Sequence, residues 1–445
     1  MIINTNDQIS KLPNDVLVKI LGRMTMVDAV RTSVLARRWE NVWKETSHLS
    51  LDMRWIARAR SLLSDVTPEA AKSVTKVIKD HRGNLESFTL FHEPCQYEQG
   101  MFEAWIQSLI HEKLTKHLML VNCRSEQNTK QNIPLNLPPK SFSHPNLHSL
   151  MLSQYDLETP HAFNSCWNIK TLKLIGISAE IEVFNVVLVS CVSLEALVLK
   201  ISCHKRSGIL KIENRKLKFL HLSCSDQIDG LEVSSPGVDI FSIESLSSDV
   251  DKVVIANPRI KFSRNYWTTG TNFPHISYNI SCPDQEEKSV GHEFMMSRPS
   301  DYMKRFGSMS VSVDLTNTKE VEMLKDVLVA WPVEMVELEI KFKNNSTPQN
   351  EGESSIGGTW KKFWEGTKPF PNANFRAYNI WLINFSGSKE EFAFASRLIT
   401  QGTVARTMVI KLSPVSPTKK SELKAAVARL KELPKGHREL GILVS

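Results

Sequence analysis

This chain of 445 residues lacks the short motifs on which many enzymes depend. It contains no P-loop, no dinucleotide-type glycine fingerprint, no GxSxG elbow and no HExxH zinc pattern. Only 18 residues are glycine, which is few for a protein that would cradle phosphate in glycine-rich loops. The sequence therefore contains no recognisable catalytic constellation.

Long apolar runs and paired cysteines are also missing. The most hydrophobic stretch, residues 183–201, is interrupted by Asn185 and Glu195, so we predict no membrane span. The seven cysteines are an odd number without a CxxC pair, which favours reduced thiols over a disulfide framework. No basic segment followed by an apolar core begins the chain. We therefore expect a protein of the cytoplasm, the nucleus or both.

Charge is modest and unevenly placed. The net charge is +7, and the basic excess falls within residues 397–445. A basic tail can meet nucleic acid, and Trp360, Trp364 and Trp381 could stack on bases. We favour a solvated helix face and core-anchoring tryptophans, and expect no nucleic-acid partner.

The histidines and cysteines do not form a metal motif. Cys203 with His204, and His221 with Cys224, lack the spacing of paired zinc ligands. We therefore expect neither a metal nor another cofactor.

Residues 10–43 are the most informative stretch. Leu12 and Pro13 predict a helix start, because proline fits the first helical turn. Three apolar stripes then recur at helical spacing. They comprise Val16, Leu17, Ile20, Leu21 and Met24; Val27, Val30 and Val34; and Trp39, Val42 and Trp43. Three short helices cannot bury all this surface against each other, so the segment predicts a protein partner.

This pattern resembles the F-box, a module that docks onto SKP-family adaptors of cullin–RING ubiquitin ligases. The matched elements are LPxxVLxxIL at 12–21, Asp28-Ala29-Val30, Thr32-Ser33, and Arg38-Trp39 with Trp43. The resemblance implies an F-box over residues 1–50 whose apolar residues are shared between adaptor contact and module core. The sequence leaves that division open for Leu12, Pro13, Val16, Leu17, Ile20, Leu21, Val30, Val34, Trp39 and Trp43.

A pattern close to LxxLxL follows the F-box. It occurs six times, at 85–90, 115–120, 147–152, 169–174, 194–199 and 217–222. The alternation predicts strands with one buried face, which only stacking on neighbouring units can cover. This resembles an irregular leucine-rich repeat. We expect an α/β fold: a solenoid of parallel strands and helices over residues 51–265, continued by a repeat-like α/β segment over 266–343.

Residues between the buried leucines are expected on the exposed face of the parallel sheet. They are mixed in charge and identify no ligand. We take five of them as a candidate target-binding face: Lys170, Lys173, Glu195, Lys218 and His221.

The C-terminal part follows a polar, low-complexity segment. Residues 344–359 predict a disordered loop, because they contain almost no apolar side chains. Residues 360–445 then alternate between strand-like and helix-like patterns. The order resembles the FBD region at the end of many plant F-box/leucine-rich-repeat proteins. The matched positions are Phe392, Ala395, Leu398, Val404, Met408 and Ile410.

Taken together, these resemblances imply a non-catalytic substrate-recognition subunit of an SKP–cullin–F-box ubiquitin ligase. The F-box would bind the adaptor, and the repeats with the C-terminal region would bind an unknown target protein. One alternative is a leucine-rich-repeat scaffold without a role in ubiquitin transfer, whose N-terminal helices only cap the solenoid. Whether a small molecule acts as co-ligand stays open at this point.

Overall fold

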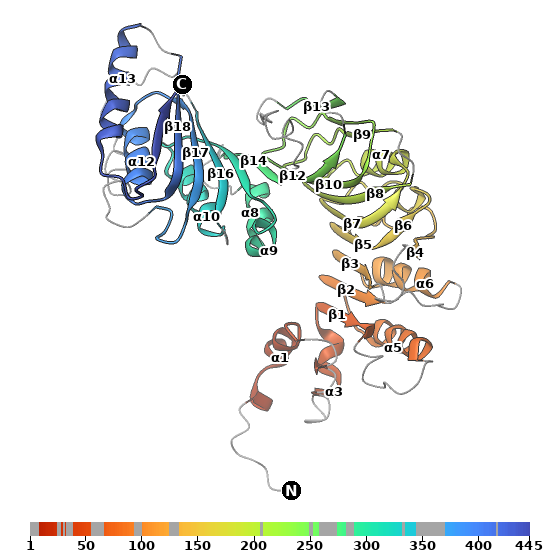
Figure 1. Ribbon diagram of the computed structural model, residues 1–445. Helices are drawn as coiled ribbons and strands as arrows, with labels where there is room; N and C mark the ends of the chain where they lie inside the picture. Colours follow the sequence, from red (N-terminus) through yellow and green to blue (C-terminus); the bar gives the residue numbers. More distant parts are fainter. Residues whose placement is uncertain are drawn as a thin grey trace, which may run out of the picture. The chain divides into compact units, whose positions relative to one another are not determined.

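A computed structural model describes residues 9–24, 28–29, 32, 39–54, 66–92, 100–123, 133–204, 208–248, 252–257, 274–281, 289–331, 334–343, 370–414 and 417–445. Val30, Val34 and the predicted loop at 344–359 lie outside these ranges. The fold is mixed α/β with mostly parallel strands, as expected (Figure 1). The described residues form two compact units. The first holds those up to Leu217, with Cys224–Ser235 and 247–254, and the second holds the remainder.

The first unit begins with short helices. They are η1 (Ile9–Lys11), α1 (Asn14–Leu21), α3 (Trp39–Val42) and η3 (Trp43–Glu45). Pro13 is extended and directly precedes the first turn of α1, as its fixed φ favours. Asp15 in the first turn and Lys19 in the last suit the helix dipole. Helix α1 packs on α3 and η3.

A parallel sheet forms the body of the first unit. Its strands, in order, are β1 (His48–Asp52), β2 (Ser87–His92), β3 (His117–Asn122), β5 (Ser149–Ser153), β7 (Thr171–Ala179) and β8 (Ala196–Cys203). Register aligns the repeat leucines across the strands. The two buried rows are Phe88, Leu118, Leu150, Leu172 and Leu197; and Leu90, Leu120, Leu152, Leu174 and Leu199. The predicted strand pattern is confirmed here.

Helices and short strands complete this unit. The helices are α5 (Val66–Asp80), α6 (Met101–Gln107), the π-helical turn η4 (Ser108–Glu112), η5 (His161–Phe163) and α7 (Ile181–Ser190). Strand β6 (Tyr155–Leu157) pairs with β4 (Ile133–Pro134) and with the end of β7. A small separate sheet joins β9 (Ile209–Ile212), β11 (Gly230–Val233) and β13 (Val253–Ile255).

The second unit is also built on strands with helices against them. Its strands are part of β10 (Phe219–Gln227), β12 (Ile240–Ser247), β14 (His275–Asn279), β15 (Ser308–Val313), β16 (Met335–Phe342), β17 (Ala377–Phe385), β18 (Val404–Leu412) and β19 (Gly441–Val444). Strand β12 is antiparallel to β14, whereas β14 to β19 are parallel to one another. The helices are α8 (Val290–Met296), α9 (Pro299–Met303), α10 (Thr318–Val329), α12 (Lys389–Thr400) and α13 (Pro417–Glu432).

The second unit contains β14 and α8 in a segment rich in polar residues. Several of its polar side chains are buried and hydrogen-bonded. His275 Nδ1 lies 2.9 Å from Ser308 Oγ, and Tyr278 Oη lies 3.0 Å from His292 Nδ1. Such pairing helps a polar sequence to occupy an interior, because hydrogen bonds offset the cost of burying polar groups.

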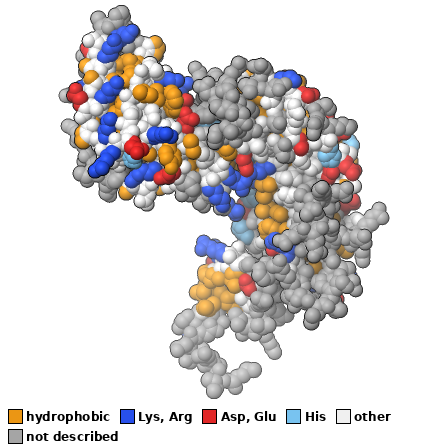
Figure 2. Space-filling model, in the orientation of Figure 1, with side chains coloured by type: hydrophobic (Ala, Val, Ile, Leu, Met, Phe, Trp, Pro, Cys, Tyr) orange, Lys and Arg blue, Asp and Glu red, His pale blue; other side chains and the backbone are white. Residues whose placement is uncertain are grey.

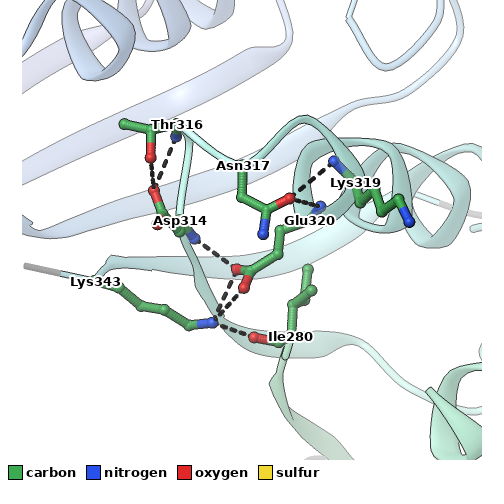
Figure 3. Close-up of polar contacts among 7 residues, drawn as sticks. All are labelled: Ile280, Asp314, Thr316, Asn317, Lys319, Glu320 and Lys343. Atoms are coloured by element: carbon green, nitrogen blue, oxygen red, sulfur yellow. Dashed lines mark hydrogen bonds and ion pairs between the residues drawn. The ribbon is translucent and has the colours of Figure 1, made fainter. Parts of the chain in front are cut away.

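The start of α10 is fixed by side chains near the ends of parallel strands (Figure 3). Asn317 accepts hydrogen bonds from the backbone of Lys319 and Glu320 at the start of α10. Glu320 accepts from the Asp314 backbone N–H at 2.8 Å and from Lys343 Nζ. Lys343 also donates to the Ile280 carbonyl. One lysine therefore links the ends of β14 and β16 to the first turn of α10.

Lys343 and Glu320 form a largely buried ion pair, with Nζ–Oε2 at 2.8 Å. Burial raises the pKa of Glu320, although the hydrogen bond from Lys343 opposes this shift. We predict that Lys343→Met destabilises the protein by about 3 kcal/mol at pH 7, because it leaves a buried carboxylate unpaired. The folded-state pKa of Glu320 then rises further. The loss should therefore shrink as the pH falls through that pKa.

Urea unfolding at pH 7 and pH 5 measures this difference. The control is Glu320→Gln with Lys343→Met, which removes both charges and should recover most of the stability at pH 7. An equal loss at both pH values would show that the lysine acts through packing alone.

Candidate protein-interaction surfaces

Helix α1 divides its apolar residues between core and surface. Leu17 is fully buried, and Leu21 is also buried, on the side that meets α3 and η3. Val16 is half-buried, whereas Ile20 is 40% exposed. Ile9, before the helix, is 58% exposed. Figure 2 shows hydrophobic side chains gathered over α1. We call Ile9, Leu12, Pro13, Val16, Ile20 and Met24 the α1 strip.

This geometry separates residues that the sequence could not separate. Of the ten predicted F-box residues, the buried members are Leu17, Leu21, Trp39 and Trp43. Those at least partly exposed are Leu12, Pro13, Val16 and Ile20. Val30 and Val34 lie outside the described residues. The spacing of 12, 16, 20 and 24 follows one side of a helix, next to the buried side.

The open face of the first unit carries a row of mostly apolar side chains. Register aligns Thr89, Met119, Met151, Lys173 and Val198 across β2 to β8, and all five are half-buried. The next row along the strands contains Phe91, Val121, Ser153, Ile175 and Lys200. Methionines adapt to irregular partners, which suits a recognition surface. We call these two rows the repeat face.

Ion pairs lie at the edge of the repeat face where its strands begin. Lys170 Nζ is 3.1 Å from Glu195 Oε1, which brings two of the predicted target-face residues together. Lys116 Nζ is 2.8 Å from Glu86 Oε2, and this hydrogen bond lowers the pKa of Glu86. Exposed pairs of this kind add little stability. Their charges therefore contribute little to holding the fold together.

The expectation that His221 is exposed is wrong. Its side chain is 1% exposed, and its ring lies 5.6 Å from that of Tyr302 and 5.9 Å from that of Phe306. Residues of α8 and α9 cover the side of β10 that alternation assigns to solvent. Phe294 of α8 also packs on Phe219. Lys218, beside it, is half-buried and belongs to the second unit.

His221 has polar partners in its buried position. Its Nδ1 lies 3.0 Å from Ser242 Oγ, and its Nε2 lies 3.3 Å from Glu244 Oε2. Ser242, itself buried, also bonds the Tyr302 hydroxyl. The group holds α9 to the strands and is closed to a large partner.

Sequence reasoning missed several side chains on the repeat face. Phe91, Val121 and Ile175 were not among the predicted solvent-facing positions, although strand alternation places them there. The signal was present. The LxxLxL motif ends before the last residues of each strand. The second row of the repeat face lies beyond the motif and was therefore not predicted.

The second unit presents another open face. Glu339, Trp381, Val409 and Leu443 are aligned across β16 to β19. Trp381, expected as a core anchor, is only half-buried, on the opposite side from Ile380 and Leu382. Lys411 Nζ lies 4.9 Å from its ring centroid. Trp360 and Trp364 lie outside the described residues.

Within the described ranges, no group of three or more His, Cys, Asp or Glu side chains is arranged to hold a metal ion. His204 instead lies 3.1 Å from Asp156, and the Sγ atoms of Cys203 and Cys224 are 4.0 Å apart. Among the helices described, none is long and apolar enough to span a bilayer.

The fold defines an α/β repeat protein with apolar side chains exposed on α1 and on its strands. Comparison with known proteins agrees. A family model described as F-box domain matches residues 9–49. Another, described as At1g61320/AtMIF1, LRR domain, matches residues 77–281.

Relatives from Arabidopsis thaliana extend the similarity over nearly the whole chain. The putative F-box protein At1g67390 is 44% identical over 442 residues, covering 98% of this chain and 91% of that protein. The F-box protein At1g80960 is 45% identical over 439 residues, covering 96% and 88%. The F-box/FBD/LRR-repeat protein At5g56420 is 24% identical over 250 residues, covering 54% and 56%. The chain belongs to the family of plant F-box proteins with leucine-rich repeats.

The division of α1 yields a stability prediction. Leu17→Ala should destabilise the N-terminal helices by about 2–5 kcal/mol, because it opens a cavity against α3 and η3. Ile20→Ala should change stability by about 0.5 kcal/mol or less, since its side chain already faces solvent. Amide hydrogen exchange of α1 in the full chain measures both. Equal effects would mean that α1 does not bury the side described here.

Proposed function

We propose that this chain is the substrate-recognition subunit of an SKP–cullin–F-box ubiquitin ligase. The α1 strip binds an SKP-type adaptor, and the adaptor connects the chain to a cullin. The observation that carries this proposal is the exposure of Ile9, Ile20 and Met24 beside a helix whose other side is fully packed. Family membership supports the same role.

The energetics of the α1 strip support a protein partner. Covering an exposed aliphatic side chain contributes about 1.5–3 kcal/mol. The binding free energy from covering a few such residues is larger than that from one exposed salt bridge, which is about 1 kcal/mol or less. Within the described part of the F-box, Ile9, Ile20 and Met24 remain exposed. The α1 strip is therefore the natural contact surface for the adaptor.

The chain acts by positioning and performs no chemistry itself. It holds a target protein near the conjugating enzyme, so that target lysines meet the ubiquitin thioester at high effective concentration. The repeat face and the C-terminal region share target recognition. The site of action is the cytoplasm, the nucleus or both.

Adaptor binding provides the first test. Val16→Asp with Ile20→Asp should abolish recovery of the full chain on immobilised SKP-type adaptor, because two carboxylates would be buried in the apolar contact. Both positions are at least partly exposed, so the thermal transition should stay unchanged. The matched control is Val329→Asp, at an exposed valine that ends α10. Full recovery of the double variant would reject the adaptor-binding role of α1.

Target recognition provides a second test. Lys170→Glu with Lys173→Glu reverses two charges on or beside the repeat face, and the side chain of Lys170 is exposed. We expect the variant to keep its fold and adaptor binding while the proteins co-purifying under proteasome inhibition change. Quantitative mass spectrometry measures this. An unchanged set of proteins would place target recognition away from this part of the solenoid.

A further inference from the structure

A groove in the first unit lies outside all the surfaces described so far. It is formed by the end of α7, strand β9 and the turn that follows β9, and its volume is 510 Å³. Leu188 lines it from the buried side of α7. Val189 and Val192 also line it, although they are 68% and 54% exposed. Large aliphatic side chains so exposed mark a contact surface when they gather at a groove.

Two asparagines fix the walls of this groove. Asn185 donates from Nδ2 to the Ile209 carbonyl at 2.9 Å and accepts at Oδ1 from the Lys211 N–H at 2.9 Å. Asn214, which is buried, donates to the Leu188 and Cys191 carbonyls at 3.0 Å each. The first amide occupies backbone groups along β9, and the second caps the end of α7. An occupant would therefore contact side chains and would not add a strand to β9.

The rim of the groove is basic. Lys211 Nζ lies 3.6 Å from Glu232, outside the groove lining. Arg215 and Lys216 are exposed, and no ion pair is found for either within the described ranges. Glu213 is the one acidic residue of the lining. The apolar surface thus lies beside an excess of positive charge, which favours an acidic partner.

We propose that this groove binds a short acidic peptide segment of another protein. A leucine, phenylalanine or similar side chain of the segment packs on Val189 and Val192. Aspartate or glutamate residues beside it pair with Arg215 and Lys216. The volume alone would also suit a small ligand. However, Val186, 45% exposed and one helical turn before Val189, continues the aliphatic surface beyond the groove lining. An extended peptide would cover both the groove and Val186, whereas a compact ligand would fill the groove alone.

The test uses the full chain and a defined pool of short fluorescent peptides. Each peptide carries one central leucine or phenylalanine among aspartate, glutamate, glycine and serine. A second pool replaces the acids by lysine and arginine, and a third replaces the central residue by glycine. We expect enrichment from the first pool only.

Variants locate the binding. Arg215→Glu with Lys216→Glu should lower the affinity for the selected peptides about tenfold or more, as for residues central to an interface. The same variant should gain binding to the basic pool. Lys72→Glu with Lys76→Glu, at exposed positions of α5, makes the same charge change elsewhere and should leave binding unaltered. Val189→Asp should also abolish binding, with Val329→Asp as its control.

Several results would overturn the proposal. One is a lack of enrichment from the first pool. Another is equal peptide binding by the Arg215→Glu/Lys216→Glu variant and the Lys72→Glu/Lys76→Glu variant. A third is binding of decanoate, as a compact apolar ligand, without binding of any peptide. Self-association that Val189→Asp removes, without peptide binding, would assign the groove to a second copy of the chain. Adaptor pull-down of the groove variants is measured separately. Because α1 contributes nothing to the groove, either proposal can fail while the other stands.

Discussion

Stacking of the repeat leucines is the constraint on which the rest of the first unit depends. Leu90, Leu120, Leu152, Leu174 and Leu199 form one continuous buried row through in-register parallel strands. No single repeat can bury its leucines alone, so each one is stable only between neighbours. The exposed positions are set by the same register. Side chains on the repeat face are spaced by the strand separation, and their identity can change without loss of the core.

Sequence patterns predicted those parts of the fold that follow from alternation and capping. The LxxLxL units became strands, and the segment after residue 370 alternates between strands and helices as expected. Patterns failed where burial comes from a distant segment. Nothing near His221 indicates that α8 and α9 will cover it, because Phe294 and Tyr302 are far along the chain. Likewise, the apolar residues of α1 look alike in sequence. Only the packing of α3 separates Leu17 from Ile20.

The candidate surfaces differ in how far sequence could reveal them. The α1 strip follows from a pattern that is long and specific. The groove beside α7 does not follow from any sequence pattern, since its valines resemble the ordinary core residues of a hydrophobic helix. Their exposure depends on how β9 and the turn at 213–216 sit against α7. Surfaces formed by segments that meet only in the fold are therefore the ones that escape pattern analysis.

The asparagine that bridges α7 and β9 has a consequence for the edge of the small sheet. A free strand edge is a template on which other chains can assemble and aggregate. Asn185 occupies the Ile209 carbonyl and the Lys211 N–H with one amide, in the manner of a short partner strand. The edge of the small sheet is thereby blunted at its centre without a further strand. This edge is thus covered by a single side chain that no apolar pattern would identify.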